Sequence, residues 1–329
     1  MNPILIVDDE PINLGLLRQI LESDYRLVFA QCGQAALAAA IKHRPSLILL
    51  DIQMPDMDGY AVCAALKANP ATESIPVIFV TSLSDSGNEE AGFKVGCVDY
   101  LSKPVSPGIV QARVRTHLSL IQTRQLENSH RDAVFMLGEA GHYRDNNMGA
   151  HIWRMAAYSK ALAKAAGWSD PDAELLELAA SMHDTGKIGI PDEVLGKPGK
   201  LDDAERQIMQ RHCQIGYDIL SKSEVPLFKL AAEVALYHHE KWDGSGYPLG
   251  LTGIAIPESA RIAALADVFD ALTMYRPYQK PWPVAIAVAT IREGSAFHFD
   301  PAMVRLFLDI QPEILEIKDK WGLVEDRKN

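Results

Sequence analysis

Short runs of apolar residues alternate with stretches of helical periodicity along the first third of the chain. The apolar runs cover residues 4–7, 27–29, 47–50, 77–80 and 98–101. Continuous apolar strands separated by helices are typical of a parallel sheet that is covered on both faces. The pattern therefore predicts an α/β domain over residues 1–124, built on a doubly wound sheet of five parallel strands.

An apolar stripe of helical spacing follows Pro107, in a stretch with no further proline before Pro171. The stripe comprises Ile109, Val110, Val114, His117, Leu118 and Ile121, and it continues more weakly through Leu126, Val134 and Leu137. It fits either a coiled-coil seam or a last helix of the first domain that runs into the next domain. Both alternatives predict a helical connector over residues 106–140 that is stiffer than a Gly/Ser linker.

The pattern from residue 125 to residue 329 is helical throughout, with turn-rich breaks. Asp170 resembles an N-cap, with Pro171 at the first helical position. Asp202 with Glu205 resembles a capping box. Residues 242–253 are rich in Gly and Pro and predict a loop. We therefore expect the second domain to be an all-α helical bundle.

Composition limits the classes of protein that this chain can be. The chain has 329 residues, enough for two domains, and its formal net charge of -11 argues against a nucleic-acid-binding protein. No apolar run approaches the roughly 18 residues of a membrane helix, and the N-terminus lacks the basic region of a signal peptide. We expect a cytoplasmic protein with free thiols at Cys32, Cys63, Cys97 and Cys213.

Polar residues stand where the predicted strands of the first domain end. Asp8 and Asp9 follow the first strand, Asp51 ends the third, Thr81 ends the fourth and Lys103 follows the fifth. The carboxyl ends of parallel strands meet at one edge of a sheet, where converging carboxylates require a cation such as Mg²⁺. Thr81 and Lys103 then offer a hydroxyl and a positive charge to a phosphoryl group on Asp51.

The segment D-I-Q-M-P-D-M-D-G at residues 51–59 and the segment L-S-K-P at residues 101–104 resemble response-regulator receiver domains, which are flavodoxin-like. The resemblance implies that Asp51 accepts a phosphoryl group from a sensor histidine kinase. It also implies that Asp8, Asp9 and the carbonyl of Gln53 hold Mg²⁺. Thr81 and Tyr100 would couple phosphorylation to the far face, and the Lys103-Pro104 peptide is expected to be cis.

An adjacent His and Asp are the centre of the second domain. An apolar helical run over residues 175–182 leads to His183 and Asp184, and Gly186 then ends the helix. A neutral imidazole beside a carboxylate is a metal-ligand pair, and Asp can bridge two ions. Lys187 follows at a spacing that allows it to meet an anionic oxygen next to those ions.

Further candidate ligands lie on or at the ends of the predicted helices. They are His151, His212, His238, His239 and Asp267. A bundle that projects such side chains inward builds a closed site for two ions. Nitrogen and oxygen ligands without thiolates suit Fe or Mn, with Ni and Zn as alternatives. Each His alone reads as a core histidine, and Cys213 reads as a buried thiol, but the joint pattern predicts a metal site.

His183-Asp184 together with H-H-E-K-W-D-G-S-G-Y-P at residues 238–248 resembles the HD-GYP family of cyclic di-GMP phosphodiesterases, within the HD superfamily. The likeness covers residues 131–307. It implies hydrolysis of cyclic di-GMP to pGpG or GMP by a water that two metal ions activate, with Asp184 and Lys187 as catalytic residues. It also implies that the Gly-Tyr-Pro loop contacts GGDEF-domain proteins, and a homodimer is compatible with this organisation.

Residues near the expected metals are candidates for holding the substrate. Asp270 shares a helix face with Asp267, so it either contacts substrate or hydrogen-bonds to a metal ligand. The full set of expected substrate contacts is Lys187, Tyr247, Asp270, Arg276, Tyr278 and Lys280. Gln279 stands where relatives often carry a basic residue, which weakens a phosphate cradle at this position.

The residue at position 147 bears on the number of metal ions. Where members with three metals carry a Glu ligand, this chain has Asn147, whose neutral amide is a poor substitute. We therefore expect two ions.

A degenerate module that binds a nucleotide or a protein without turnover is the main alternative to the enzyme, and an HD hydrolase of another nucleotide is a further one. Retention of all seven ligands and of Lys187 favours the enzyme.

Overall fold

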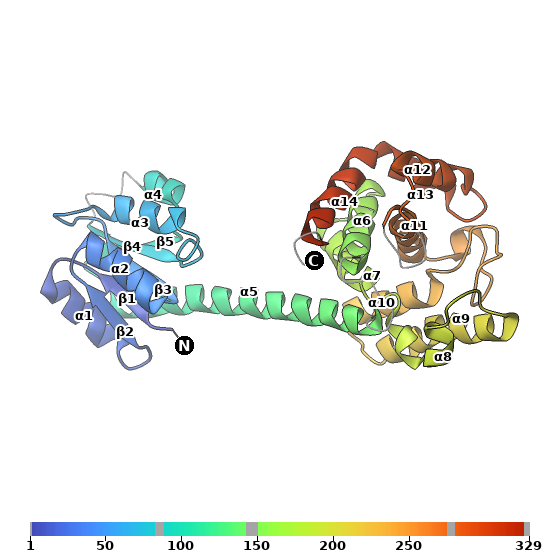
Figure 1. The fold of residues 1–329 in the computed structure, drawn as a ribbon. Helices are drawn as coiled ribbons and strands as arrows, with labels where there is room; N and C mark the ends of the chain where they lie inside the picture. Colours follow the sequence, from blue (N-terminus) through green and yellow to red (C-terminus); the bar gives the residue numbers. More distant parts are fainter. Residues whose placement is uncertain (1, 83–88, 143–150, 275–279, 326–329) are drawn as a thin grey trace. The chain divides into compact units, whose positions relative to one another are not determined.

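The structure is a computed structural model that describes residues 2–82, 89–142, 151–274 and 280–325. Its contacts divide the chain into two compact units, Met1–Glu127 and Asn128–Asn329 (Figure 1). Four residues discussed above, Asn147, Arg276, Tyr278 and Gln279, lie outside the described residues.

The first unit is built on five parallel strands in the order β2-β1-β3-β4-β5. The strands are β1 (Ile4–Val7), β2 (Leu27–Ala30), β3 (Leu47–Asp51), β4 (Val77–Ser82) and β5 (Asp99–Lys103). The helices between them are α1 (Pro11–Leu21), α2 (Gly33–His43), α3 (Gly59–Ala68) and α4 (Glu89–Val95), and α5 (Pro107–His142) follows the last strand. The predicted five-stranded parallel sheet is confirmed.

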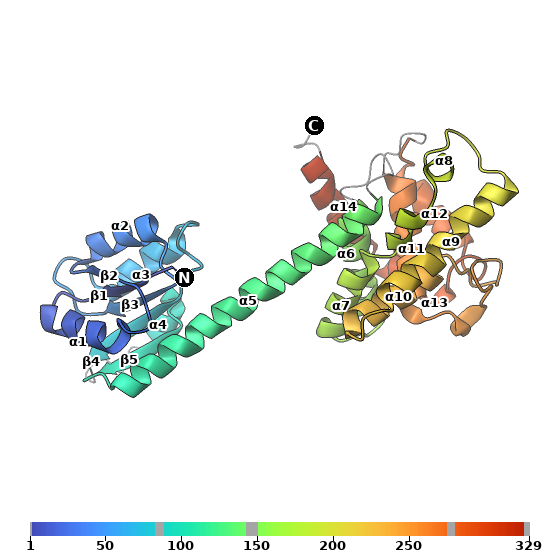
Figure 2. The same ribbon diagram turned by 90° about the horizontal axis from the view of Figure 1, so that it is seen from below.

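Alternate residues of each central strand point to opposite faces of the sheet. Leu5, Ile48 and Phe79 pack on one face against α2 and α3. Ile6 and Leu49 pack on the other face against α1 and the start of α5 (Figure 2). Both faces are covered, so the sheet is doubly wound, and β1 and β3 are neighbours whose carboxyl ends carry the predicted acidic site.

The connector is one continuous helix, α5, and the boundary between the two compact units falls within it. Val110, Val114 and Leu118 are buried in the core of the first unit. Val134 and Phe135 are buried in the second unit. Four residues of the stripe therefore pack in cores within the chain, namely Val110, Val114, Leu118 and Val134. This favours a last helix of the first domain that runs on into the next domain over a coiled-coil seam.

The second unit is helical, as predicted. Its α-helices are α6 (His151–Ala165), α7 (Asp170–Ala180), α8 (Asp192–Leu195), α9 (Asp203–Leu220), α10 (Pro226–Tyr237), α11 (Glu258–Thr273), α12 (Val284–Glu293), α13 (Pro301–Asp309) and α14 (Gln311–Glu325). Two short 3-10 helices are η2 (Thr185–Gly189) and η3 (Gly253–Ala255). Helix α6 packs on α7 and α11, and α9 packs on α10 and η2, which brings together the elements that carry or flank the candidate ligands.

The two predicted helix starts have different outcomes. Asp202 and Glu205 form the capping box at the start of α9, as expected. The N-cap of α7 is Ser169, whose hydroxyl accepts from the backbone N–H of Asp172, so the expectation that Asp170 is the cap was wrong by one residue. A hydroxyl and a carboxylate cap equally well, and the sequence alone did not separate two adjacent cap residues.

Two expectations from composition concern membranes and thiols. Within the described ranges, no helix combines the length and the apolarity needed to cross a bilayer. All four cysteines are free, and three of them, Cys63, Cys97 and Cys213, are buried.

Candidate metal centre and phosphorylation site

Seven candidate ligands reach one region of the second unit from different elements. His151 begins α6, His183 and Asp184 lie between α7 and η2, His212 lies in α9, His238 and His239 follow α10, and Asp267 lies in α11. Gly186 allows η2 to approach α9, since a Cβ at that position would lie 1.9 Å from the carbonyl oxygen of His212. The expectation that Gly186 ends the helix was wrong, because α7 ends at Ala180 and Gly186 lies within η2. Its lack of a side chain instead lets this segment pack closely against α9 at His212.

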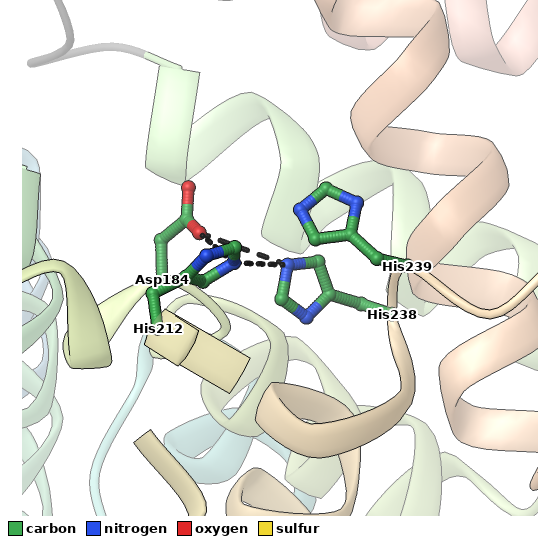
Figure 3. Close-up of side chains that lie close together, drawn as sticks. All are labelled: Asp184, His212, His238 and His239. Carbon is green, nitrogen blue, oxygen red and sulfur yellow. Dashed lines mark hydrogen bonds and ion pairs between the residues drawn. The ribbon is translucent and has the colours of Figure 1, made fainter. Parts of the chain in front are cut away.

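The ligand atoms form two groups. Asp184, His212, His238 and His239 form one group, and His151, His183 and Asp267 form the other. Within each group the ligand atoms lie within 4.8 Å of one another. Asp184 joins the groups, because its Oδ1 lies 3.2 Å from His212 Nε2 and its Oδ2 lies 3.3 Å from His183 Nε2. Figure 3 shows His212 and His238 directed at the Asp184 carboxylate.

Three of the imidazoles are held by backbone carbonyls. His183 Nδ1 lies 3.0 Å from the Ala180 oxygen, and His212 Nδ1 lies 2.7 Å from the Met209 oxygen. His238 Nδ1 lies 3.0 Å from a carbonyl oxygen of α10. A carbonyl only accepts, so each Nδ1 carries the hydrogen and donates it. Each Nε2 then presents a lone pair to the site, the tautomer that a metal ligand needs.

The protonation states also suit bound cations. Burial lowers the pKa of His212 to about 4. Burial, reinforced by His238 and His212, lowers the pKa of His239. Burial alone would raise the pKa of Asp267, but His183 and His151 outweigh it and hold this pKa below its ordinary value. The lowered pKa values of His212, His239 and Asp267, with nitrogen and oxygen donors in two adjoining groups, fit two divalent ions.

His151 is supported by a side chain in place of a carbonyl. Its Nδ1 lies 2.7 Å from Asp270 Oδ2. Asp270 is 1% exposed and also accepts from Arg154, through Nε at 2.7 Å and Nη2 at 3.1 Å. Both carboxylate oxygens are engaged inside the protein, which favours the alternative that Asp270 supports a ligand over the alternative that it contacts substrate.

The Gly-Tyr-Pro loop packs directly against the ligands. The ring of Tyr247 lies 4.7 Å from that of His239. Glu240 is 2% exposed, and its carboxylate accepts from the backbone N–H groups of Leu249, Gly250 and Leu251. A Cβ at Gly246 would lie 2.3 Å from the backbone nitrogen of Lys241, so only glycine fits there. Tyr247, expected as a substrate contact, thus packs against His239 within the protein.

The acidic site of the first unit has the predicted arrangement. Asp8, Asp9 and Asp51 form one group of oxygen ligands. Lys103 Nζ lies 2.9 Å from both Asp8 Oδ2 and Asp51 Oδ2. Burial raises the pKa of Asp51 despite its hydrogen bond from Lys103. Burial would lower the pKa of Lys103, but its bonds to Asp51 and Asp8 outweigh this and raise it.

The remaining predicted residues of the first unit differ in their surroundings. Thr81 is buried near the end of β4, and the side chain of Gln53 is exposed. The ring of Tyr100 packs 5.6 Å from that of Phe79 and 5.3 Å from that of Phe93. The Lys103-Pro104 peptide is cis, as expected.

Comparisons with known proteins agree with this geometry. The profile of the response regulator receiver domain matches residues 4–115, and that of the HD domain matches residues 124–303. A probable cyclic di-GMP phosphodiesterase of Vibrio cholerae is 40% identical to this chain, over 97% of the chain and 80% of the relative. The chain belongs to the family of response regulators that join a receiver domain to an HD domain.

Two further relatives of this response regulator are named for different substrates. The cyclic di-GMP phosphodiesterase response regulator RpfG of Xanthomonas campestris is 36% identical over 98% of this chain and 92% of its own length. A 3′3′-cGAMP-specific phosphodiesterase of V. cholerae is 42% identical over 59% of this chain and 37% of its own length. The HD domain makes this response regulator a metal-dependent hydrolase.

Sequence reasoning missed two residues that organise the HD site. Arg154 was not considered, although it stands three residues after His151 and so shares its helix face. Glu240 was noted only as part of the His-His-Glu motif. Of the expected substrate residues, Lys187 Nζ lies 2.7 Å from Asp184 Oδ2, and Lys280 is exposed. Arg276 and Tyr278 fall outside the described ranges.

Proposed function

We propose that this protein is a response regulator whose HD domain hydrolyses cyclic di-GMP, to pGpG or GMP, under control of phosphorylation at Asp51. The observation that carries the proposal is the pair of ligand groups joined by Asp184. Relatives that match nearly the whole chain are named cyclic di-GMP phosphodiesterases, which supports the choice of substrate.

The chain holds two divalent ions in this proposal. The ligands are His151, His183, Asp184, His212, His238, His239 and Asp267. Their nitrogen and oxygen donors favour Fe or Mn, with Ni or Zn as alternatives. When bound, such ions lower the pKa of a water to near neutrality and neutralise charge on a phosphate. An ion count of two follows from the ligand groups together with the neutral side chain of Asn147.

Other residues stabilise charge on the phosphate, contact the substrate or orient a metal ligand. The Lys187 ammonium, 2.7 Å from Asp184 Oδ2, is placed beside the ligands to meet a non-bridging phosphate oxygen. Tyr247 closes the site over His239, and Arg276, Tyr278 and Lys280 are proposed phosphate contacts. Asp270 fixes the tautomer of His151.

The receiver domain needs a phosphodonor, and a sensor histidine kinase is the expected one. We propose that Asp8, Asp9 and the Gln53 carbonyl hold Mg²⁺ next to Asp51, with Lys103 near the phosphoryl oxygens. Contacts of the Gly-Tyr-Pro loop with GGDEF-domain proteins, homodimerisation and a cytoplasmic location stay predictions.

Two substitutions test the proposed active site. Asp184→Ala is expected to lose bound metal and hydrolysis together, because Asp184 joins the two ligand groups. Lys187→Ala is expected to keep the metal and lose about 10²- to 10³-fold in kcat, as for other groups that stabilise developing charge. Metal content by elemental analysis and nucleotide products by chromatography give the two readouts. Cleavage of cyclic di-GMP by Asp184→Ala at the wild-type rate would show that the proposed site is wrong.

The same assay separates the competing functions. Cyclic di-GMP and 3′3′-cGAMP are offered in parallel to wild-type protein reloaded with Fe or Mn under anaerobic conditions. Preferential cleavage of cyclic di-GMP supports the proposal, and preferential cleavage of 3′3′-cGAMP reassigns the substrate. Binding of either nucleotide without turnover by fully metal-loaded protein identifies a binding module.

A further inference from the structure

A buried arginine lies behind the ligand group of His151. Arg154 is 2% exposed, and it donates from Nε and Nη2 to the two oxygens of Asp270, at 2.7 Å and 3.1 Å. Asp270 in turn contacts His151 Nδ1 at 2.7 Å. We propose that Arg154 is a positioning residue for the metal centre, which acts through Asp270 to fix the tautomer and orientation of His151. The proposal rests on the metal-dependent function proposed above.

His151 differs from His183, His212 and His238 in the group that holds its Nδ1 atom. His183, His212 and His238 each donate from Nδ1 to a carbonyl of the preceding helical turn. His151 is the first described residue of α6, and its Nδ1 partner is the Asp270 carboxylate from α11. The orientation of His151 therefore depends on a side chain, which has rotamers, and not on a rigid helical turn.

A further point is the electrostatic state of that side chain. Asp270 is 1% exposed, so an ionised carboxylate there needs a buried positive partner. The planar guanidinium binds both oxygens at once and leaves Oδ2 directed at His151 Nδ1.

The last point is the direction in which His151 then points. With the hydrogen on Nδ1, Nε2 carries the lone pair, and it lies 3.5 Å from Asp267 Oδ1 within the second ligand group. Arg154 supports His151 through Asp270, so we expect its loss to weaken the group of His151, His183 and Asp267. The other group has its own support, since His212 Nδ1 lies 2.7 Å from the Met209 carbonyl oxygen.

The experiment measures the two metal affinities separately. Wild-type protein is titrated with Mn²⁺ against a competing chelator, which yields two dissociation constants. In Arg154→Met, which keeps the bulk of the side chain without its charge, one constant is expected to weaken by about 10- to 100-fold, the range for partners behind a ligand. The other constant should stay unchanged. His212→Asn, measured alongside, should weaken the opposite constant and so assign each to its group.

Three further variants keep the test decisive. Arg154→Met/Asp270→Asn removes both buried charges, so it folds even if the single variant does not, and it should show the same one-site deficit. Arg154→Lys keeps the charge but not the two-point geometry and should recover part of the affinity. Arg261→Met breaks another Arg–Asp pair of the same unit, with Asp300, neither member of which is a proposed ligand, and should change neither constant.

The outcomes distinguish this proposal from the proposed function. Wild-type affinity at both sites in Arg154→Met overturns the positioning role while leaving the enzyme intact. Equal weakening of both constants overturns it as well, because it indicates general destabilisation. Wild-type protein that binds no divalent ion defeats the proposed function itself.

Discussion

Hydrogen bonds to backbone carbonyls fix the tautomer of three proposed ligand histidines. Helical carbonyls hold the hydrogen of His183, His212 and His238 on Nδ1, so Nε2 faces the site. Burial also opposes the protonation of His212 and His239, as their lowered pKa values show. Burial of unprotonated imidazole makes the metal-free protein sensitive to acid.

That sensitivity can be measured at His212. Its pKa falls from the ordinary 6.5 to about 4 in the folded protein. Between these values the unfolded chain binds the proton and the folded chain does not, so stability is lost as the pH falls from 6.5 towards 4. The contribution is of order 3 kcal/mol at most. In metal-free protein, His212→Asn should therefore show a smaller drop in unfolding free energy between pH 7 and pH 4.5.

Tryptophan fluorescence during urea unfolding is the suitable probe, because it reports only on the helical unit. The tryptophans are Trp153, Trp168, Trp242, Trp282 and Trp321. His43→Asn, at an exposed position of the receiver, is the control and should leave the pH dependence as in wild type. An identical drop in wild type and His212→Asn would contradict the assignment.

At the scale of elements, α5 packs against the segment that carries His183 and Asp184. A Cβ at Gly138 would lie 2.4 Å from the Ser181 oxygen, and a Cβ at Gly141 would lie 2.8 Å from the Thr185 Cα. The backbone of α5 at Gly141 thus packs against the backbone of Thr185, the residue that follows the proposed ligand Asp184. The position of Asp184 depends on this contact, which only glycine permits.

Gly141→Ala is expected to push the backbone at Thr185 away and weaken metal binding. The clash is with backbone atoms, which cannot rotate aside, and overpacking of this kind costs about 1–3 kcal/mol of stability. Gly108→Ala is the matched control on the same helix, since a Cβ there meets nothing within 4 Å. Metal affinity and the urea midpoint of tryptophan fluorescence should fall in Gly141→Ala alone. Equal behaviour of the two variants would show that the contact is not tight in solution.

At the scale of the whole molecule, one helix belongs to both units. The first part of α5 is buried against the receiver sheet, through Val110 and Val114. Its last turns lie against the His183-Asp184 segment through Gly138 and Gly141. A change at the receiver therefore has a continuous helical connection to the segment that holds the metal ligands.

Phosphorylation of the receiver is testable in the intact protein. Acetyl phosphate with Mg²⁺ should add one phosphoryl group to the wild type, because Asp51 stands beside Asp8, Asp9 and Lys103. Asp51→Asn should gain none, and the rate of cyclic di-GMP cleavage should change on phosphodonor addition in the wild type only. Intact-mass measurement and the cleavage assay give the two readouts. Equal incorporation in both proteins would remove Asp51 as the acceptor.

The sequence by itself determined the five-stranded sheet, the helical second domain and the two sets of candidate ligands. Strand periodicity and the rule that the ends of parallel strands share an edge were sufficient to group Asp8, Asp51 and Lys103. These predictions depend on local periodicity and on the few possible orders of parallel strands, so they do not require knowledge of how the helices pack. The N-cap of α7 shows the limit, because Ser169 and Asp170 are equally able to cap.

Only the tertiary structure decided how the candidate ligands divide into two groups and which residues support them. Asp270 follows Asp267 by one helical turn, and the spacing alone allowed it to face either substrate or a ligand. Its role follows from Arg154 and His151, which stand 116 and 119 residues away in the chain. A hydrogen bond between elements so distant depends on how α6 and α11 pack, which no local pattern encodes. The same holds for Gly141, whose tight contact with Thr185 exists only once α5 has docked.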